Sequence, residues 1–137
     1  MDTFTSYTLK NTVLKNRIVM PPMCMYSSDD TGLANDFHYT HYATRAIGGV
    51  GLIIVEATGV VPNGRISDKD LGIWDDIHIE GLKKIADSVK KYGSKVAIQL
   101  NHGGRKYEGV TKELVAPSPI AFNEHSAVPK ELSKEQN

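Results

Sequence analysis

The sequence predicts an α/β fold built from parallel strands and amphipathic helices. Three apolar runs are continuous and rich in β-branched residues, and they cover residues 18–20, 52–55 and 96–100. Continuous apolar runs are typical of strands covered on both faces, as in parallel sheets. Two amphipathic segments separate the runs, so the order is strand, helix, strand, helix, strand. We expect the three strands to be parallel neighbours in chain order, joined by right-handed crossovers.

Composition limits the class of protein. The chain has 137 residues, 40% hydrophobic and 23% charged, as in one globular domain. Sixteen Lys and Arg balance sixteen Asp and Glu, so no net field favours nucleic acid or an anionic membrane. The single cysteine, Cys24, excludes an internal disulfide and suits a reducing compartment. With no signal peptide and no apolar span of about 20 residues, we expect a cytoplasmic protein.

The N-terminal half contains a predicted hairpin and the first helix. The hairpin covers residues 7–15 and turns near Lys10 and Asn11. The helix lies between Asp36 and the glycines at 48–49, because apolar residues recur with helical spacing at Tyr39, Tyr42, Ala43, Ala46 and Ile47. His38 and His41 share a face of this helix, and we interpret them as packing residues. Segment 48–51 is interpreted as a helix-to-strand turn because a phosphate loop would follow a strand.

The second helix is predicted over residues 79–92. One apolar stripe runs along it, made of Leu82, Ile85, Ala86 and Val89. Asp75 and Asp76 are placed to cap its start, and Gly93 its end. Beyond residue 106 the periodicity fades, and prolines interrupt the chain. Ser133 then begins an S-x-x-Q capping box, which predicts a helix start and a chain that continues beyond it.

Each predicted strand runs into a polar segment that contains glycine or proline. These segments cover residues 21–26, 56–59 and 101–106. Ligands of α/β folds bind at the carboxyl ends of parallel strands. The three segments therefore predict a binding site at one edge of the sheet.

Several of these segments carry long motifs. Residues 15–26, which end in Cys24-Met25-Tyr26, closely resemble the first barrel strand of the Old Yellow Enzyme family, in its bacterial thermophilic-like subclass. Segments 51–57, 64–66, 71–74 and 99–106 match that family in the same order. The resemblance implies the N-terminal part of an FMN-binding TIM (β/α)8 barrel. Residues 1–16 would form a hairpin cap, 17–106 about three βα units, and 107–137 the start of a capping insert.

The resemblance implies flavin contacts for six residues: Pro21, Pro22, Met23, Cys24, Ala57 and Gln99. Cys24 would lie beside the N5/O4 edge and tune the flavin potential, and Gln99 would bond the pyrimidine edge. One carboxamide can satisfy the adjacent donor and acceptor atoms of that edge. Cys24 and Tyr26 would serve catalysis, with Tyr26 and Lys106 facing the substrate. Side chains expected to face the barrel interior are Ile18, Met20, Ile54 and Ile98.

The implied activity is that of an FMN-dependent oxidoreductase. NADPH or NADH would supply electrons for reducing the activated C=C bond of an α,β-unsaturated carbonyl or nitro compound, in a dimer or tetramer. The family's substrate-binding histidine pair, proton-donating tyrosine and phosphate site would follow residue 137, so this segment alone is expected to be inactive. A truncated or split non-catalytic fragment is the alternative. A metal-dependent barrel hydrolase using His38, His41 and His102 is a third hypothesis, although no metal site is predicted.

Overall fold

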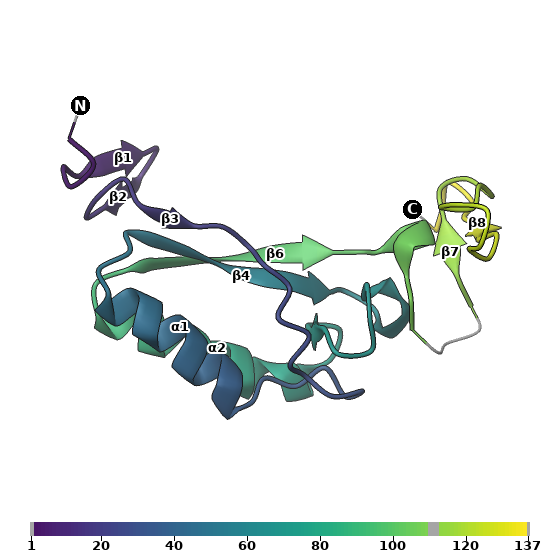
Figure 1. Ribbon diagram of the computed structural model, residues 1–137, viewed down its shortest axis with the longest axis horizontal. Coiled ribbons are helices and arrows are strands. Elements are labelled where there is room, and N and C mark those ends of the chain that lie inside the picture. The colour runs from purple at the N-terminus through teal and green to yellow at the C-terminus, as the bar shows by residue number, and fades with distance from the viewer. Residues whose placement is uncertain (1, 110–112, 137) are drawn as a thin grey trace.

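A parallel sheet backed by two helices forms the centre of the molecule (Figure 1). The computed structural model describes residues 2–109 and 113–136. The sheet contains β3 (Val19–Met20), β4 (Leu52–Gly59), β5 (Leu71–Gly72) and β6 (Lys95–Asn101). β4 pairs in parallel with β3 on one edge and with β6 on the other, which confirms the predicted neighbours and direction. The short β5, which the sequence did not predict, pairs with the end of β4.

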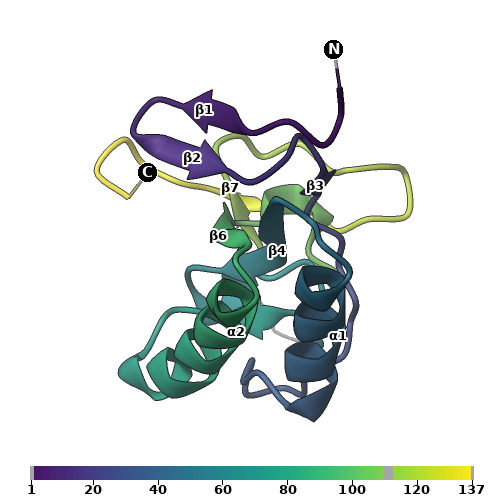
Figure 2. The same ribbon diagram turned by 90° about the vertical axis from the view of Figure 1, so that its left-hand side faces the viewer.

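Both helices lie on the same face of this sheet. Figure 2 shows α1 (Asp36–Ile47) and α2 (Ile79–Lys91) side by side beneath it. Strands that follow chain order, with every helix on one face, are singly wound, as in an arc of a barrel. A doubly wound sheet would carry helices on both faces. The arrangement is therefore that of consecutive βα units.

The hydrophobic core fills the space between the sheet and the helices. Ile53 and Val55 of β4 pack there against Ile85 and Val89 of α2. Met20 belongs to this core cluster, and the partly buried Ile98 packs against it, so the prediction that these two side chains face the barrel interior is wrong. A run that is apolar on both faces carries no alternation that would assign its faces.

Both helices lie within their predicted ranges, but the predicted cap of the second helix acts on a separate turn. Asn35 caps α1, which begins at Asp36, and the Asn35 side chain accepts from the Phe37 amide. Asp75 caps a 3-10 turn, η2 (Asp76–His78), and α2 follows that turn without a side-chain cap. On α1, Ile47 is exposed, whereas His38 is fully buried. Burial of both histidines at 38 and 41 confirms that they pack on the helix face.

The two ends of the described chain lie outside the α/β layers. β1 (Tyr7–Leu9) and β2 (Thr12–Leu14) form the predicted antiparallel hairpin, and Lys10 takes a positive φ at its turn. Further along, η1 (Pro62–Gly64) and η3 (Gly104–Lys106) are short 3-10 turns, and β7 (Val115–Ala116) pairs in parallel with β8 (Lys130–Glu131). The predicted helix start at Ser133 is a turn through residue 136, in which the Ser133 amide donates to the Gln136 side chain. Residue 137 lies outside the described residues.

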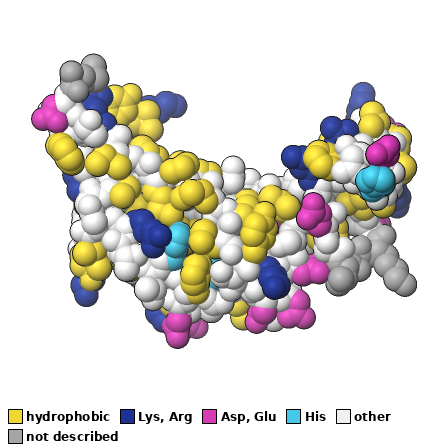
Figure 3. All heavy atoms as spheres, viewed as in Figure 1, with side chains coloured by type: hydrophobic (Ala, Val, Ile, Leu, Met, Phe, Trp, Pro, Cys, Tyr) yellow, Lys and Arg dark blue, Asp and Glu magenta, His cyan; other side chains and the backbone are white. Residues whose placement is uncertain are grey.

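Hydrophobic side chains are also visible on the surface, over the sheet and the hairpin (Figure 3). Exposed ones include Leu9, Val13, Val19 and Leu100. Among the helices in the described part of the chain, none combines the length and apolar character that a membrane span requires.

Candidate active site

The three parallel strands end at the same edge of the sheet, and the loops that follow them form the candidate active site. Segment 21–28 follows β3, segment 60–70 follows β4, and residues 102–103 connect β6 to η3. Because β4 pairs in parallel with both β3 and β6, the three loops emerge at one edge. This is the edge at which α/β folds bind ligands.

Ala57 and Gln99 are directly paired across β4 and β6. Ala57 is almost fully buried, while Gln99 is exposed on the face opposite to the helices. An exposed carboxamide beside a buried strand offers a donor and an acceptor to a ligand without any loss of internal packing. The pair therefore presents a hydrogen-bonding side chain on the open face of the sheet.

Cys24 is half-buried in the loop after β3 and lies next to Ala57 and Tyr26. Burial raises the pKa of its thiol, and the carboxylates of Asp70 and Glu56 raise it further. Hydrogen bonds from the Ala57 backbone and with the Tyr26 side chain act against this rise in pKa. The thiol is thus protonated at neutral pH, and it is a weak hydrogen-bond donor and not a thiolate nucleophile.

Tyr26 has an unusual backbone conformation at the tip of the same loop. Its φ of 51° lies in the left-handed region, which a residue with a bulky side chain rarely adopts. The side chain is 49% exposed. The nearby Cys24 raises the pKa of the phenol, as does desolvation, so the phenol is an O–H donor at neutral pH. An exposed, neutral donor on a rigid ring suits the binding of a carbonyl or nitro oxygen.

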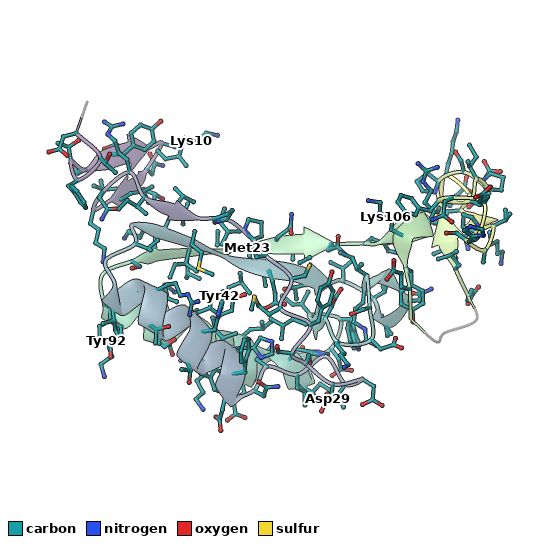
Figure 4. All side chains as sticks on the ribbon, viewed as in Figure 1. Lys10, Met23, Asp29, Tyr42, Tyr92 and Lys106 are labelled. Atoms are coloured by element: carbon teal, nitrogen blue, oxygen red, sulfur yellow. The ribbon has the colours of Figure 1, made fainter. Side chains whose placement is uncertain are left out.

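Pro21, Pro22 and Met23 form the extended segment between β3 and Cys24. Pro21 and Met23 are exposed, and Pro22 is half-buried. Figure 4 shows Met23 at the sheet and Tyr42 between the sheet and α1. The three side chains offer an apolar surface beside Cys24, and their contact with a flavin stays a prediction.

Lys106 ends η3 and lies towards the C-terminal part of the molecule (Figure 4). Its ammonium stands 4.6 Å from the centre of the Phe122 ring, a cation–π contact. Lys106 therefore lies against Phe122, while Cys24, Tyr26 and Ala57 gather at the end of the sheet. A substrate contact of Lys106 stays a prediction.

The roles of two residues in this region were missed by reasoning from the sequence. Glu56 is completely buried where β4 approaches the loop, and its carboxylate accepts a hydrogen bond from the Met25 amide at 2.9 Å. Tyr42, on α1, donates its hydroxyl hydrogen to the same carboxylate. The one available signal was the position of Glu56, an acidic residue inside a strongly β-forming segment. Among the described residues, no three metal-ligating side chains cluster.

The chain is similar to known proteins over nearly its whole length. The family model of the NADH:flavin oxidoreductase / NADH oxidase family matches residues 2–136. The chain is 69% identical over 136 residues to an NADPH dehydrogenase of Clostridium acetobutylicum, covering 99% of this chain and 40% of that protein. It is 58% identical over 134 residues to an NADPH dehydrogenase of Bacillus subtilis, covering 97% and 39%. The chain thus spans about 40% of the length of these relatives.

Solved structures give the same fold. Morphinone reductase superposes with a TM-score of 0.87 at 27% identity, over 98% of this chain and 40% of that one. The Old Yellow Enzyme from a Pichia species superposes with a TM-score of 0.88 at 28% identity, over 98% and 38%. The described sheet and helices therefore correspond to part of a TIM barrel, as predicted.

Proposed function

The chain belongs to the NADH:flavin oxidoreductase / NADH oxidase family, and from this premise we propose that it forms one wall of the FMN site of an ene-reductase. The observation that carries the proposal is the grouping of Cys24, Ala57 and Gln99 at the carboxyl edge of the sheet. Gln99 would bond the pyrimidine edge of the flavin, and the Ala57 backbone and Cys24 would lie against the N5/O4 side. The apolar surface of Pro21, Pro22 and Met23 fits a flat aromatic ring.

When bound, FMN supplies hydride transfer from NADPH or NADH to the activated C=C bond of an α,β-unsaturated carbonyl or nitro compound. Tyr26 would hold the electron-withdrawing group of that substrate through its phenol. A hydrogen bond to this oxygen strengthens as negative charge develops on it, so it favours the transition state. The neutral thiol of Cys24 would donate weakly to the flavin edge and bias its potential.

Lys106, at the end of η3, is proposed as a second neighbour of the substrate. The complete site requires a larger barrel, whose other strands would carry the phosphate-binding end. We further propose a dimer or tetramer, and a cytoplasmic location that suits the single thiol of Cys24.

A hybrid enzyme tests this function. Residues 2–136 of this chain would replace the matching segment of the NADPH dehydrogenase of Clostridium acetobutylicum, which is 69% identical to it. We expect the purified hybrid to be yellow, to bind FMN stoichiometrically and to oxidise NADPH in the presence of an enone. A folded hybrid that binds no FMN would overturn the proposal.

Residues 1–137 alone serve as the second arm of the same assay. In the described part of the chain, no strand pairs with the outer edge of β6, so the sheet is an open arc. We expect no turnover and no stoichiometric FMN binding from this polypeptide. A yellow 137-residue protein that reduces enones would show instead that the described arc is sufficient.

A further inference from the structure

Glu56 lies at an irregularity of the sheet. The pairing of β4 with β6 shifts register between Val55 and Ala57, so Glu56 is the extra residue of a β-bulge. Ile53 and Val55 face the helices. In a regular strand Glu56 would therefore point to the other face. The bulge turns its side chain towards α1, where it is 0% exposed.

The carboxylate of Glu56 is held by two hydrogen bonds from different elements. Its Oε1 accepts from the Tyr42 hydroxyl at 3.0 Å, and the same hydroxyl accepts from the Glu56 amide at 2.9 Å. Its Oε2 accepts from the Met25 amide at 2.9 Å. Tyr42 thus fixes one end of the carboxylate, and the other end is directed at the loop after β3.

His38 completes the surroundings of the carboxylate. Its Nε2 lies 3.8 Å from Glu56 Oε1, and both side chains are fully buried. Burial raises the pKa of Glu56 and lowers the pKa of His38. His38 Nδ1 lies 3.2 Å from the Asn35 amide nitrogen and 3.0 Å from Asn35 Oδ1, in the capping box of α1.

The amide that Glu56 binds belongs to the residue between Cys24 and Tyr26. A left-handed backbone at Tyr26 is unfavourable and persists only where its neighbours hold it. The loop has no regular secondary structure, and its anchors are polar: Ser27 Oγ donates to the Met25 carbonyl, and Asn35 Nδ2 donates to the Ser27 carbonyl. Met25 is thus held by two side chains, Ser27 at its carbonyl and the fully buried Glu56 carboxylate at its amide.

Stability alone is a poor reason for this arrangement. A buried carboxylate carries a desolvation penalty that an apolar residue of similar size would avoid. What the carboxylate provides is a fixed acceptor for one loop amide. We propose that Glu56 is a positioning residue, held by Tyr42, that fixes the Cys24–Tyr26 loop through the Met25 amide and so keeps the thiol beside Ala57. This role adds a positioning residue to the proposed flavin site, and its functional meaning rests on that proposed function.

The test uses the 137-residue chain without flavin, so its outcome is independent of FMN binding. Residue-specific hydrogen exchange is measured by NMR for the Met25 amide in Glu56→Ala and Glu56→Gln. Gln keeps an acceptor oxygen, so we expect near wild-type protection, whereas Ala should speed exchange about tenfold. Glu80→Gln, on the exposed side of α2, is the matched control and should change nothing.

A second readout separates positioning from a purely structural role. Alkylation of Cys24 is followed as a function of pH, which reports the pKa of the thiol. Because the Glu56 charge raises that pKa, Glu56→Gln should shift the profile to lower pH while the Met25 amide stays protected. Protection of the Ile53 and Val55 amides reports whether each variant is folded. If Glu56→Ala unfolds, the proposal is decided by the Met25 exchange and the Cys24 alkylation profile of Glu56→Gln. An unchanged alkylation profile in Glu56→Gln, or a protected Met25 in folded Glu56→Ala, would overturn the proposal.

Discussion

The two faces of the sheet are built from the same apolar runs but have different surroundings. On one face Met20, Ile53 and Val55 are buried beneath α1 and α2. On the other, Val19 is 43% exposed and Gln99 is open to solvent. Side chains on the first face stabilise the fold of the described chain. Side chains on the second face are open to contact with a ligand. Substitutions on the two faces should therefore separate stability from binding.

The largest effect is expected at the centre of the helix-covered face. Ile53→Ala removes a completely buried side chain and leaves a cavity, so the free energy of unfolding should fall by about 2–5 kcal/mol. Ile54→Ala, one residue further on the opposite face, is the matched control and should cost less because Ile54 is only half-buried. Urea denaturation measures both. Equal losses for the two variants would contradict the comparison of the faces.

The next effect concerns the polar part of the same covered face. Tyr42→Phe removes the hydroxyl that lies between the Glu56 amide and carboxylate, and it leaves buried polar groups without that partner. A lost buried partner costs about 1–3 kcal/mol, measured as the free energy of unfolding. Tyr39→Phe is a useful control, since the Tyr39 hydroxyl donates to the Ala34 carbonyl in a partly buried site. A Tyr42→Phe variant as stable as the wild type would show that water replaces the phenol.

On the open face, the expected effect is on binding. Gln99→Leu should weaken FMN binding by the hybrid enzyme by about one to two decades, because a polar ring edge loses its partner at about 1–3 kcal/mol. Its free energy of unfolding should stay near that of the parent, since Gln99 is exposed. Fluorescence titration with FMN gives the affinity. An unchanged affinity would remove Gln99 from the proposed site.

The sequence was sufficient to predict the hairpin, both helices and the three main parallel strands, in their order. The hairpin, both helices and three parallel neighbours are in place because spacing, turn residues and β-branched runs are local signals. The faces were not predictable for Met20 and Ile98, since a doubly apolar strand does not alternate. The extension of β4 from residue 55 to Gly59 was not predictable either, because the acidic Glu56 interrupts the apolar run.

The position of the candidate site could be predicted from the sequence, but the buried residues that hold its loop in place could not. The strand ends marked the binding edge, and the family motifs named Cys24, Ala57 and Gln99, which lie at that edge. The hydrogen bond between Tyr42 and Glu56 was not predicted, because it depends on a β-bulge that no local sequence pattern indicates. The packing of His38 on the helix face was predicted, but its position 3.8 Å from the Glu56 carboxylate was not, since tertiary packing sets that contact.

The smallest expected effect is a pH dependence beneath the covered face. Burial lowers the pKa of His38 in the folded protein, below about 6.5 for an unperturbed histidine. Its contribution to stability is therefore present above about pH 6.5 and is lost as the pH falls through the folded-state pKa. Glu56 acts in the opposite sense: its folded-state pKa is raised, so its contribution is lost as the pH rises through that value.

The contribution of His38 is obtained by comparing the pH dependence of the free energy of unfolding in the wild type and in His38→Gln. His38→Gln keeps an acceptor for the Asn35 amide at the third position of the helix and removes the titrating ring. Between about pH 7.5 and 5.5, the wild type should lose more stability than this variant, because protonating the buried ring opposes folding. His41 is present in both proteins, and its contribution largely cancels. His125→Gln, at an exposed position, should follow the wild type. Parallel stability curves for the wild type and His38→Gln would mean that the ring is solvated when it is protonated.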